Sequence, residues 1–63
     1  MSATEMRFLR IADVLERVPV SRPTIYRLIE RREFPRPVKI GSTSLWPEHE
    51  VDQWMNEKVA ARD

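Results

Sequence analysis

The sequence predicts one small, mainly α-helical domain with a single β-hairpin, in the order helix, turn, helix, hairpin, helix. Three stretches carry apolar residues at intervals of three and four, which is the spacing of one buried helix face. Another stretch alternates apolar and polar residues beside the only glycine of the chain. A chain of 63 residues buries only about 60% of its unfolded surface, so we expect a single domain over 1–63 with no room for a catalytic cleft.

The first predicted helix lies within RIADVLERV, residues 10–18. Its apolar stripe consists of Ile11, Val14, Leu15 and Val18. We expect Pro19 to end this helix, because proline disfavours helical geometry in the residue before it. Residues 1–8 are expected to form a flexible tail in front of it.

The second predicted helix begins after Ser21, a favoured N-cap whose hydroxyl accepts a bond from an unpaired backbone N–H. Proline is tolerated in the first turn, where Pro23 falls. The buried stripe is formed by Ile25, Leu28 and Ile29. At 3.6 residues per turn the opposite face carries Pro23, Thr24, Arg27, Glu30 and Arg31, and one flank carries Arg22 and Tyr26. We expect the helix to stop before Pro35.

The hairpin is predicted over residues 38–46, after an extended segment that contains two prolines. Val38 and Ile40 alternate with Lys39, and Gly41 opens a turn-like stretch. The third helix is expected to start at Pro47, with acidic residues in its first turn. Its predicted apolar stripe is Val51, Trp54, Met55 and Val59, and we expect both Trp46 and Trp54 to belong to the core.

Charge is distributed unevenly along the chain, although the net charge is only +1. Residues 21–40 hold six basic and two acidic side chains, net +4, whereas residues 41–63 hold two basic and five acidic side chains, net −3. A local basic surface is typical of a nucleic-acid-binding protein. The alternative is an arginine-rich helix that is merely solvated.

Several classes are disfavoured by what the sequence lacks. It has no cysteine, no apolar run near the roughly 18 residues of a membrane span, and no signal-peptide-like apolar region. No nucleophile–base pair or phosphate-binding loop is visible, so we do not expect an enzyme. His49 has neither a cysteine nor a second histidine to share a metal with, and we expect no metal or cofactor.

The stretch LRIADVLERVPVSRPTIYRLIERREFPRPVKIG, followed by LWPEHEVDQWM, resembles the AlpA family of small prophage regulators. That family is close to the excisionases of mobile elements and to the DNA-binding domain of MerR-type regulators. The resemblance runs from about Leu9 to Met55, and its most specific parts are SRPTIYRLI, FPRPVKIG and EVDQW. It implies a winged helix-turn-helix, with the second helix in the major groove and the hairpin as a wing on the backbone or minor groove.

The resemblance and the exposed face of the second helix together select the residues expected at DNA. These are Ser21, Arg22, Pro23, Thr24, Tyr26, Arg27, Arg31, Arg36, Lys39, Ser42 and Thr43. Alternatives remain: Arg27 and Arg31 could only confer solubility, Thr24 could only support its helix, and Tyr26 could be half core. The expected wing tip carries no arginine or lysine, so any contact there would come from hydroxyls bonding phosphate oxygens.

The leading hypothesis is a cytoplasmic bacterial protein that binds double-stranded DNA as a transcriptional regulator, an excisionase, or both. We expect a monomer when free, cooperative assembly on DNA, and integrase as a further partner. The second hypothesis is a protein-interaction module, either an antirepressor or an integrase adapter, that uses the same fold without reading DNA. Its binding face would be the acidic third helix, which carries Glu48, Glu50, Asp52 and Glu57.

Overall fold

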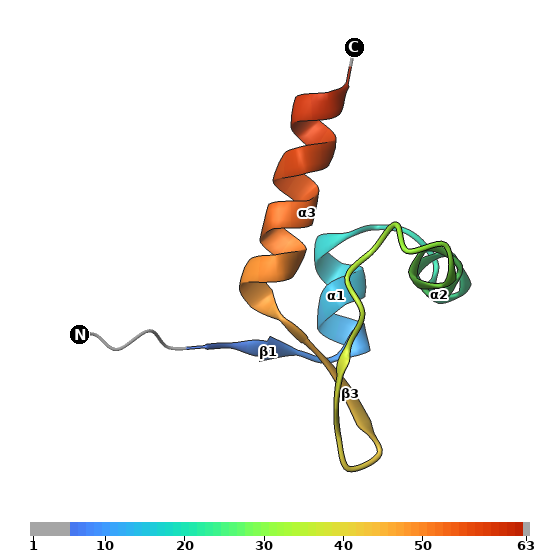
Figure 1. Cartoon of the computed structure of the whole chain (residues 1–63), viewed down its shortest axis with the longest axis vertical. Coiled ribbons are helices and arrows are strands. Elements are labelled where there is room, and N and C mark those ends of the chain that lie inside the picture. Colours follow the sequence, from blue (N-terminus) through green and yellow to red (C-terminus); the bar gives the residue numbers. More distant parts are fainter. Residues whose placement is uncertain (1–5, 63) are drawn as a thin grey trace, which may run out of the picture.

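The computed structural model describes residues 6–62, and its elements follow the predicted order with one addition. The elements are β1 (Phe8–Leu9), α1 (Ile11–Arg17), α2 (Arg22–Glu30), β2 (Val38–Ile40), β3 (Thr43–Pro47) and α3 (Glu48–Ala61). The mainly α class with a small hairpin is confirmed, as is the winged helix-turn-helix order, with β2 and β3 as the wing. Figure 1 shows α3 and the wing extending in opposite directions from the point where β3 passes into α3.

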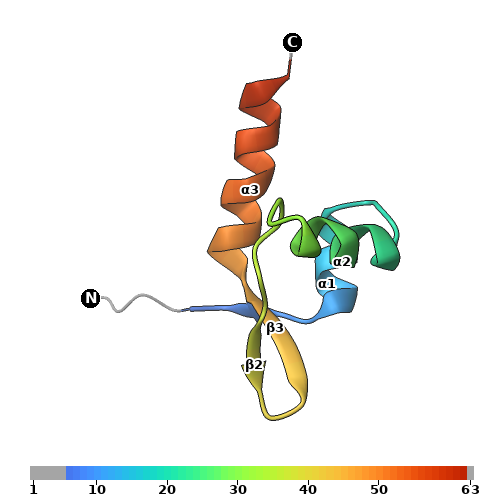
Figure 2. The ribbon, with the colours of Figure 1, turned by 45° about the vertical axis from the view of Figure 1, so that its right-hand side comes forward.

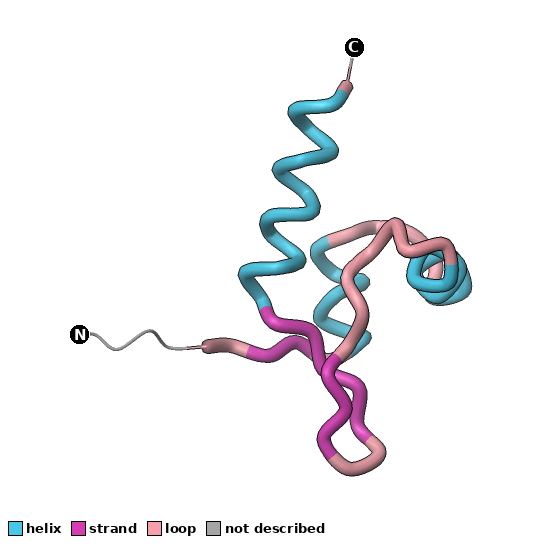
Figure 3. The backbone as a smooth tube through the Cα atoms, viewed as in Figure 1, coloured by secondary structure: helices cyan, strands magenta, loops and turns pink. Residues whose placement is uncertain are grey.

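The addition is the strand β1, which makes the sheet three-stranded and antiparallel in the order β1-β3-β2 (Figure 3). Phe8 pairs with Pro47 and Leu9 with Trp46, and the Glu48 N–H donates to the Arg7 carbonyl at 2.8 Å. The expected tail over 1–8 is therefore too long at its C-terminal end, because β3 offers unpaired backbone groups that Phe8–Leu9 satisfies. Residues 1–5 of that expected tail lie outside the described residues.

The two faces of this sheet differ in what they meet. Cross-strand partners share a face and successive residues change face, so Leu9, Trp46, Ser44 and Lys39 lie on one side. Leu9 and Trp46 are buried there against the helices. The outer side carries the exposed side chains Phe8, Val38 and Ile40.

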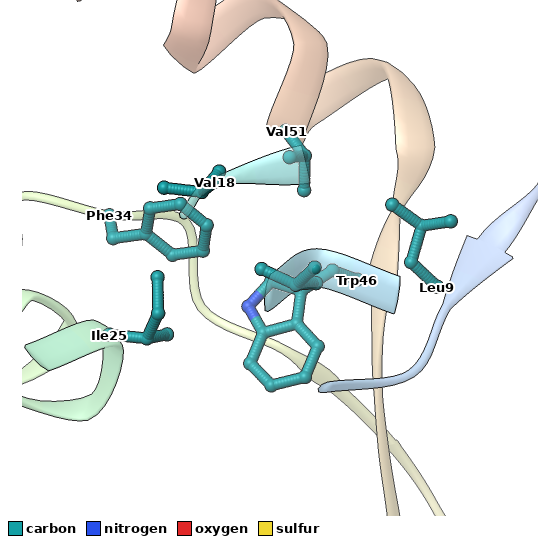
Figure 4. Close-up of a cluster of buried hydrophobic side chains, with 7 residues drawn as sticks. Leu9, Val18, Ile25, Phe34, Trp46 and Val51 are labelled. Carbon is teal, nitrogen blue, oxygen red and sulfur yellow. The ribbon is translucent and has the colours of Figure 1, made fainter. Parts of the chain in front are cut away.

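A single core joins all the helices to the sheet. It consists of Leu9, Val14, Val18, Ile25, Phe34, Trp46 and Val51 (Figure 4). Trp46 is fully buried, as expected, and Trp54 is packed against the core but only half-buried. Val59, the last residue of the predicted apolar stripe of α3, is not part of the core. This side chain is 57% exposed, since the C-terminal end of α3 extends beyond the rest of the domain (Figure 1).

An arginine on α1 connects that helix to the start of α3. The Arg17 guanidinium donates to Glu48 at 2.5 Å and to Asp52 at 3.0 Å. The hydrogen bond to Glu48 holds the pKa of Arg17 above its ordinary value. The guanidinium therefore stays charged, as arginine side chains do in proteins. This pairing links α1 to the start of α3 and occupies two of the acidic groups of α3.

Candidate nucleic-acid interface

The N-terminus of α2 is fixed by its own side chains. Ser21 is the N-cap, and its hydroxyl accepts a hydrogen bond from the Thr24 N–H at 3.3 Å. The Ser21 and Thr24 hydroxyls also lie 2.7 Å apart and share a hydrogen bond. Pro23 occupies the first turn, so the predicted start of the helix is confirmed. The first residues of α2 are thus held in one conformation before any ligand arrives.

One side of α2 is buried and the other is free. Ile25 is fully buried and Ile29 only half-buried, so the buried stripe is centred on Ile25. The opposite side exposes Pro23, Arg27 and Arg31, as predicted. Figure 2 shows that this helix stands at one side of the domain, separate from α3.

The predicted basic residues form no ion pairs with carboxylates of residues 6–62. Over residues 6–62 the ion pairs are those of Arg17 with Glu48 and Asp52. The exposed basic side chains of α2, the segment after it and the wing are Arg22, Arg27, Arg31, Arg36 and Lys39. Free cations at these positions keep a positive surface available to an anionic partner.

α2 ends in a left-handed turn made by an arginine. Arg32 has φ of 62°, the Glu33 N–H donates to the Leu28 carbonyl at 2.8 Å, and the Arg32 N–H donates to the Ile29 carbonyl at 3.0 Å. This is the Schellman pattern of helix ends, in which glycine usually occupies the left-handed position. The turn redirects the chain so that Phe34 enters the core.

Two tryptophans hold the segment that runs from α2 to the wing. The Trp54 indole N–H donates to the Glu33 carbonyl at 2.6 Å, and the Trp46 indole N–H donates to the Pro35 carbonyl at 2.9 Å. Between these bonds the Phe34 ring packs edge-on against Trp54, with ring centroids 4.9 Å apart. Since each donor is anchored on the sheet or on α3, the end of α2 and the base of the wing are fixed relative to the body of the domain.

The wing places a basic and a hydroxyl side chain on the side of the sheet that faces the helices. Lys39 pairs with Ser44, and both lie on the same face as Trp46, whose ring is approached edge-on by Tyr26 of α2. The turn contains Gly41 at φ of 63°, followed by the exposed Ser42 and Thr43 at the start of β3. Lys39 therefore points to the side of the sheet on which α2 lies.

Tyr26 connects the core to the exposed surface of α2. Its ring centroid lies 6.5 Å from that of Trp46 at an interplanar angle of 63°, while 42% of the residue remains exposed. The sequence suggested that Tyr26 could belong partly to the core and partly to the binding surface, and its position allows both. One edge packs on the core, and the other is open to a ligand.

The predicted site residues divide into two groups by position. Ser21, Arg22, Pro23, Thr24, Tyr26, Arg27 and Arg31 lie on α2 or at its cap, and Arg36, Lys39, Ser42 and Thr43 lie on the following segment and the wing. All are exposed except the half-buried Thr24. Sequence reasoning missed the positioning of Glu33 and Pro35 by the two indoles. The signal available was a pair of tryptophans, each with an N–H that needs a partner when its ring packs inside.

Two further properties concern the described part of the chain. None of the helices found there is long and apolar enough to cross a membrane. Within residues 6–62, no group of three or more histidine, cysteine, aspartate or glutamate side chains is placed to hold a metal ion.

The fold and this basic surface define a small protein of the winged helix-turn-helix class. Residues 7–59 match the family model described as prophage CP4-57 regulatory protein (AlpA). The chain is also 42% identical over 60 residues to an uncharacterised protein, ORF88, of Enterobacteria phage P4, which covers 94% of this chain and 68% of the phage protein. No solved structure matches significantly. The chain belongs to the AlpA family of prophage regulatory proteins, as its sequence motifs predicted.

Proposed function

We propose that this prophage regulatory protein binds double-stranded DNA in a sequence-specific manner, as a transcriptional regulator, an excisionase, or both. The observation that carries the proposal is the set of five exposed basic side chains on α2, the following segment and the wing, none of which is paired with a carboxylate of residues 6–62. Lysine and arginine that neutralise phosphates supply most of the affinity of such proteins for DNA. The capped N-terminus of α2 is where helix-turn-helix proteins reach base edges.

Binding is expected to weaken steeply with salt. If three to five of these cations meet phosphates, a plot of log K against log salt has a slope of roughly −3 to −5. Fluorescence anisotropy with a duplex carrying the attachment site or integrase promoter of the host element, compared with a scrambled duplex, measures both slope and specificity. A slope near zero would contradict the proposal.

A matched pair of charge-removing variants locates the contact. Arg27→Ala removes a cation from the exposed side of α2 and is expected to reduce the steepness of the salt slope by about 1. Arg62→Ala removes a cation beyond α3, whose C-terminal end points away from the wing (Figure 1), and is expected to leave the slope unchanged. Equal changes of the salt slope in the two variants would indicate that DNA binding depends on the overall charge of the protein and not on the surface of α2.

The interaction-module alternative is weakened by the pairing at Arg17. Two of the four carboxylates that would form its acidic face, Glu48 and Asp52, are bound within the fold. What remains of that face is Glu50 and Glu57. Protein contacts fit better as a supplement to DNA binding than as its replacement.

Cooperative assembly and an integrase contact belong to this same proposal. One helix reads only a few base pairs, so a single copy selects poorly among competing genomic sites. Neighbouring copies on repeated sites would supply the missing specificity, and the exposed apolar side chains of the outer sheet face offer them a contact surface. Titration of duplexes with one site or several checks this, and equal affinity per site on both would point to a partner such as integrase instead.

A further inference from the structure

A small apolar hollow lies on the exposed surface of α2. Five residues line it, Pro23, Tyr26, Arg27, Ile29 and Glu30, and it is an open depression with a volume of about 430 Å³. Pro23, Tyr26, Arg27 and Glu30 follow one another at helical intervals of three and four, so they form a stripe along one side of the helix. The proline ring, the tyrosine ring and Ile29 supply carbon, and the arginine and the glutamate supply charge at its edge.

The hollow is held in shape by the core. Tyr26 packs edge-on against the fully buried Trp46, and Ile29 packs against the buried cluster. Pro23 sits in the first turn of the helix that Ser21 caps. Its three apolar walls are therefore fixed before a ligand binds, which reduces the entropy lost on binding.

The charge at the edge restricts what can enter. The carboxylate of Glu30 repels phosphate, and the carbons of Pro23 and Ile29 donate no hydrogen bond to it. Phosphate can be bound only at the rim, by Arg27 and the Tyr26 hydroxyl, and not inside the hollow. The sugar–phosphate backbone therefore fits poorly, although the surrounding segment of the chain has a net charge of +4 that attracts DNA. A base edge in the major groove remains as the part of the duplex that fits this position.

We propose that this hollow receives the 5-methyl group of a thymine, which makes Pro23, Tyr26 and Ile29 specificity-determining residues for one base pair. The methyl group of thymine is the one apolar group that the base pairs present in the major groove. This inference rests on the proposed function, because it requires that α2 lie in the major groove of bound DNA. It adds the identity of one base that the protein selects.

The experiment removes only the methyl group. Duplexes that bind the full-length chain are selected from a randomised pool. Each thymine of the selected sequence is then replaced in turn by deoxyuridine, and the dissociation constant is measured. At one thymine per bound copy, loss of the methyl group is expected to weaken binding about fourfold, which is the effect of one buried methyl group. No protein variant is needed, so misfolding cannot produce the result.

A protein variant then tests whether the responding thymine lies in the hollow. Pro23→Ala removes one apolar wall at an exposed position, and we expect it to reduce the thymine-to-deoxyuridine affinity ratio towards 1. The matched control is Val20→Ala, which shortens an exposed apolar side chain just before the cap and outside the hollow. This variant is expected to keep the full ratio.

The possible outcomes distinguish failure of the thymine site from failure of DNA binding itself. Selected duplexes that bind with a steep salt dependence but tolerate deoxyuridine at every position would overturn the thymine site and leave DNA binding standing. A methyl effect that persists unchanged in Pro23→Ala would also overturn it. Failure to select or bind any duplex would overturn both proposals.

Discussion

The arginines of this domain have different environments in its two charged regions. On the α1–α3 side, Arg17 is bound to Glu48 and Asp52 of the fold itself. On the side of α2 and the wing, Arg22, Arg27 and Arg31 are exposed and pair with no carboxylate among residues 6–62. The same side chain therefore stabilises the fold in one region and stays available to a ligand in the other.

The difference lies in what surrounds each arginine. Arg17 faces the first turns of α3, where acidic side chains cluster near the positive end of the helix dipole. The exposed side of α2 faces solvent, because the opposite side of the helix packs into the core through Ile25. Basic residues on such an unopposed helix face indicate a ligand-binding role better than a count of charges does.

The largest effect is expected from breaking the buried side of α2. Ile25→Ala opens a cavity at a fully buried position and should lower the free energy of unfolding by about 2–5 kcal/mol. Thermal melting followed by circular dichroism measures this loss. In a domain this small, such a loss removes much of the folded population.

The comparison for that variant is Arg27→Ala, on the opposite side of the same helix. It should melt like the unmodified protein and bind DNA more weakly. If Arg27→Ala melted as early as Ile25→Ala, the assignment of the two sides of α2 would be wrong.

A smaller effect of opposite sign is expected at the end of α2. Arg32→Gly places glycine in a left-handed conformation that costs an L-residue about 1 kcal/mol, so the domain should become more stable by about that amount. Chemical denaturation with urea measures the gain. The neighbouring Arg31→Gly is the matched control, because Arg31 has φ of −83° and gains nothing from glycine. Destabilisation by Arg32→Gly would show that its side chain contributes more than the strain costs.

The smallest effect on stability is expected from Arg17→Ala. This change leaves Glu48 and Asp52 without their cation, so the melting temperature should fall slightly at low salt and less at high salt, since exposed ion pairs are weak and screened. DNA binding should be unchanged, in contrast to Arg27→Ala. Reduced DNA affinity in Arg17→Ala would indicate that the two regions are coupled.

The element order, the capped start of α2 and the exposed basic side of that helix could be predicted from the sequence. These features depend on local rules: a serine N-cap, a proline in the first turn, and apolar residues at helical spacing. Such rules act within a few residues, so a single sequence carries them. The motifs around them also pointed to the family that the comparisons established.

The contacts across the fold could not be predicted, because they depend on how the elements pack together. β1 forms because the edge of β3 is free to pair with Phe8–Leu9, and Arg17 finds Glu48 because α1 and the start of α3 come together. The two indole N–H groups reach the carbonyls of Glu33 and Pro35 for the same reason. Each of these contacts joins segments distant in sequence, and the periodicity of one segment carries no information about the partner it will meet.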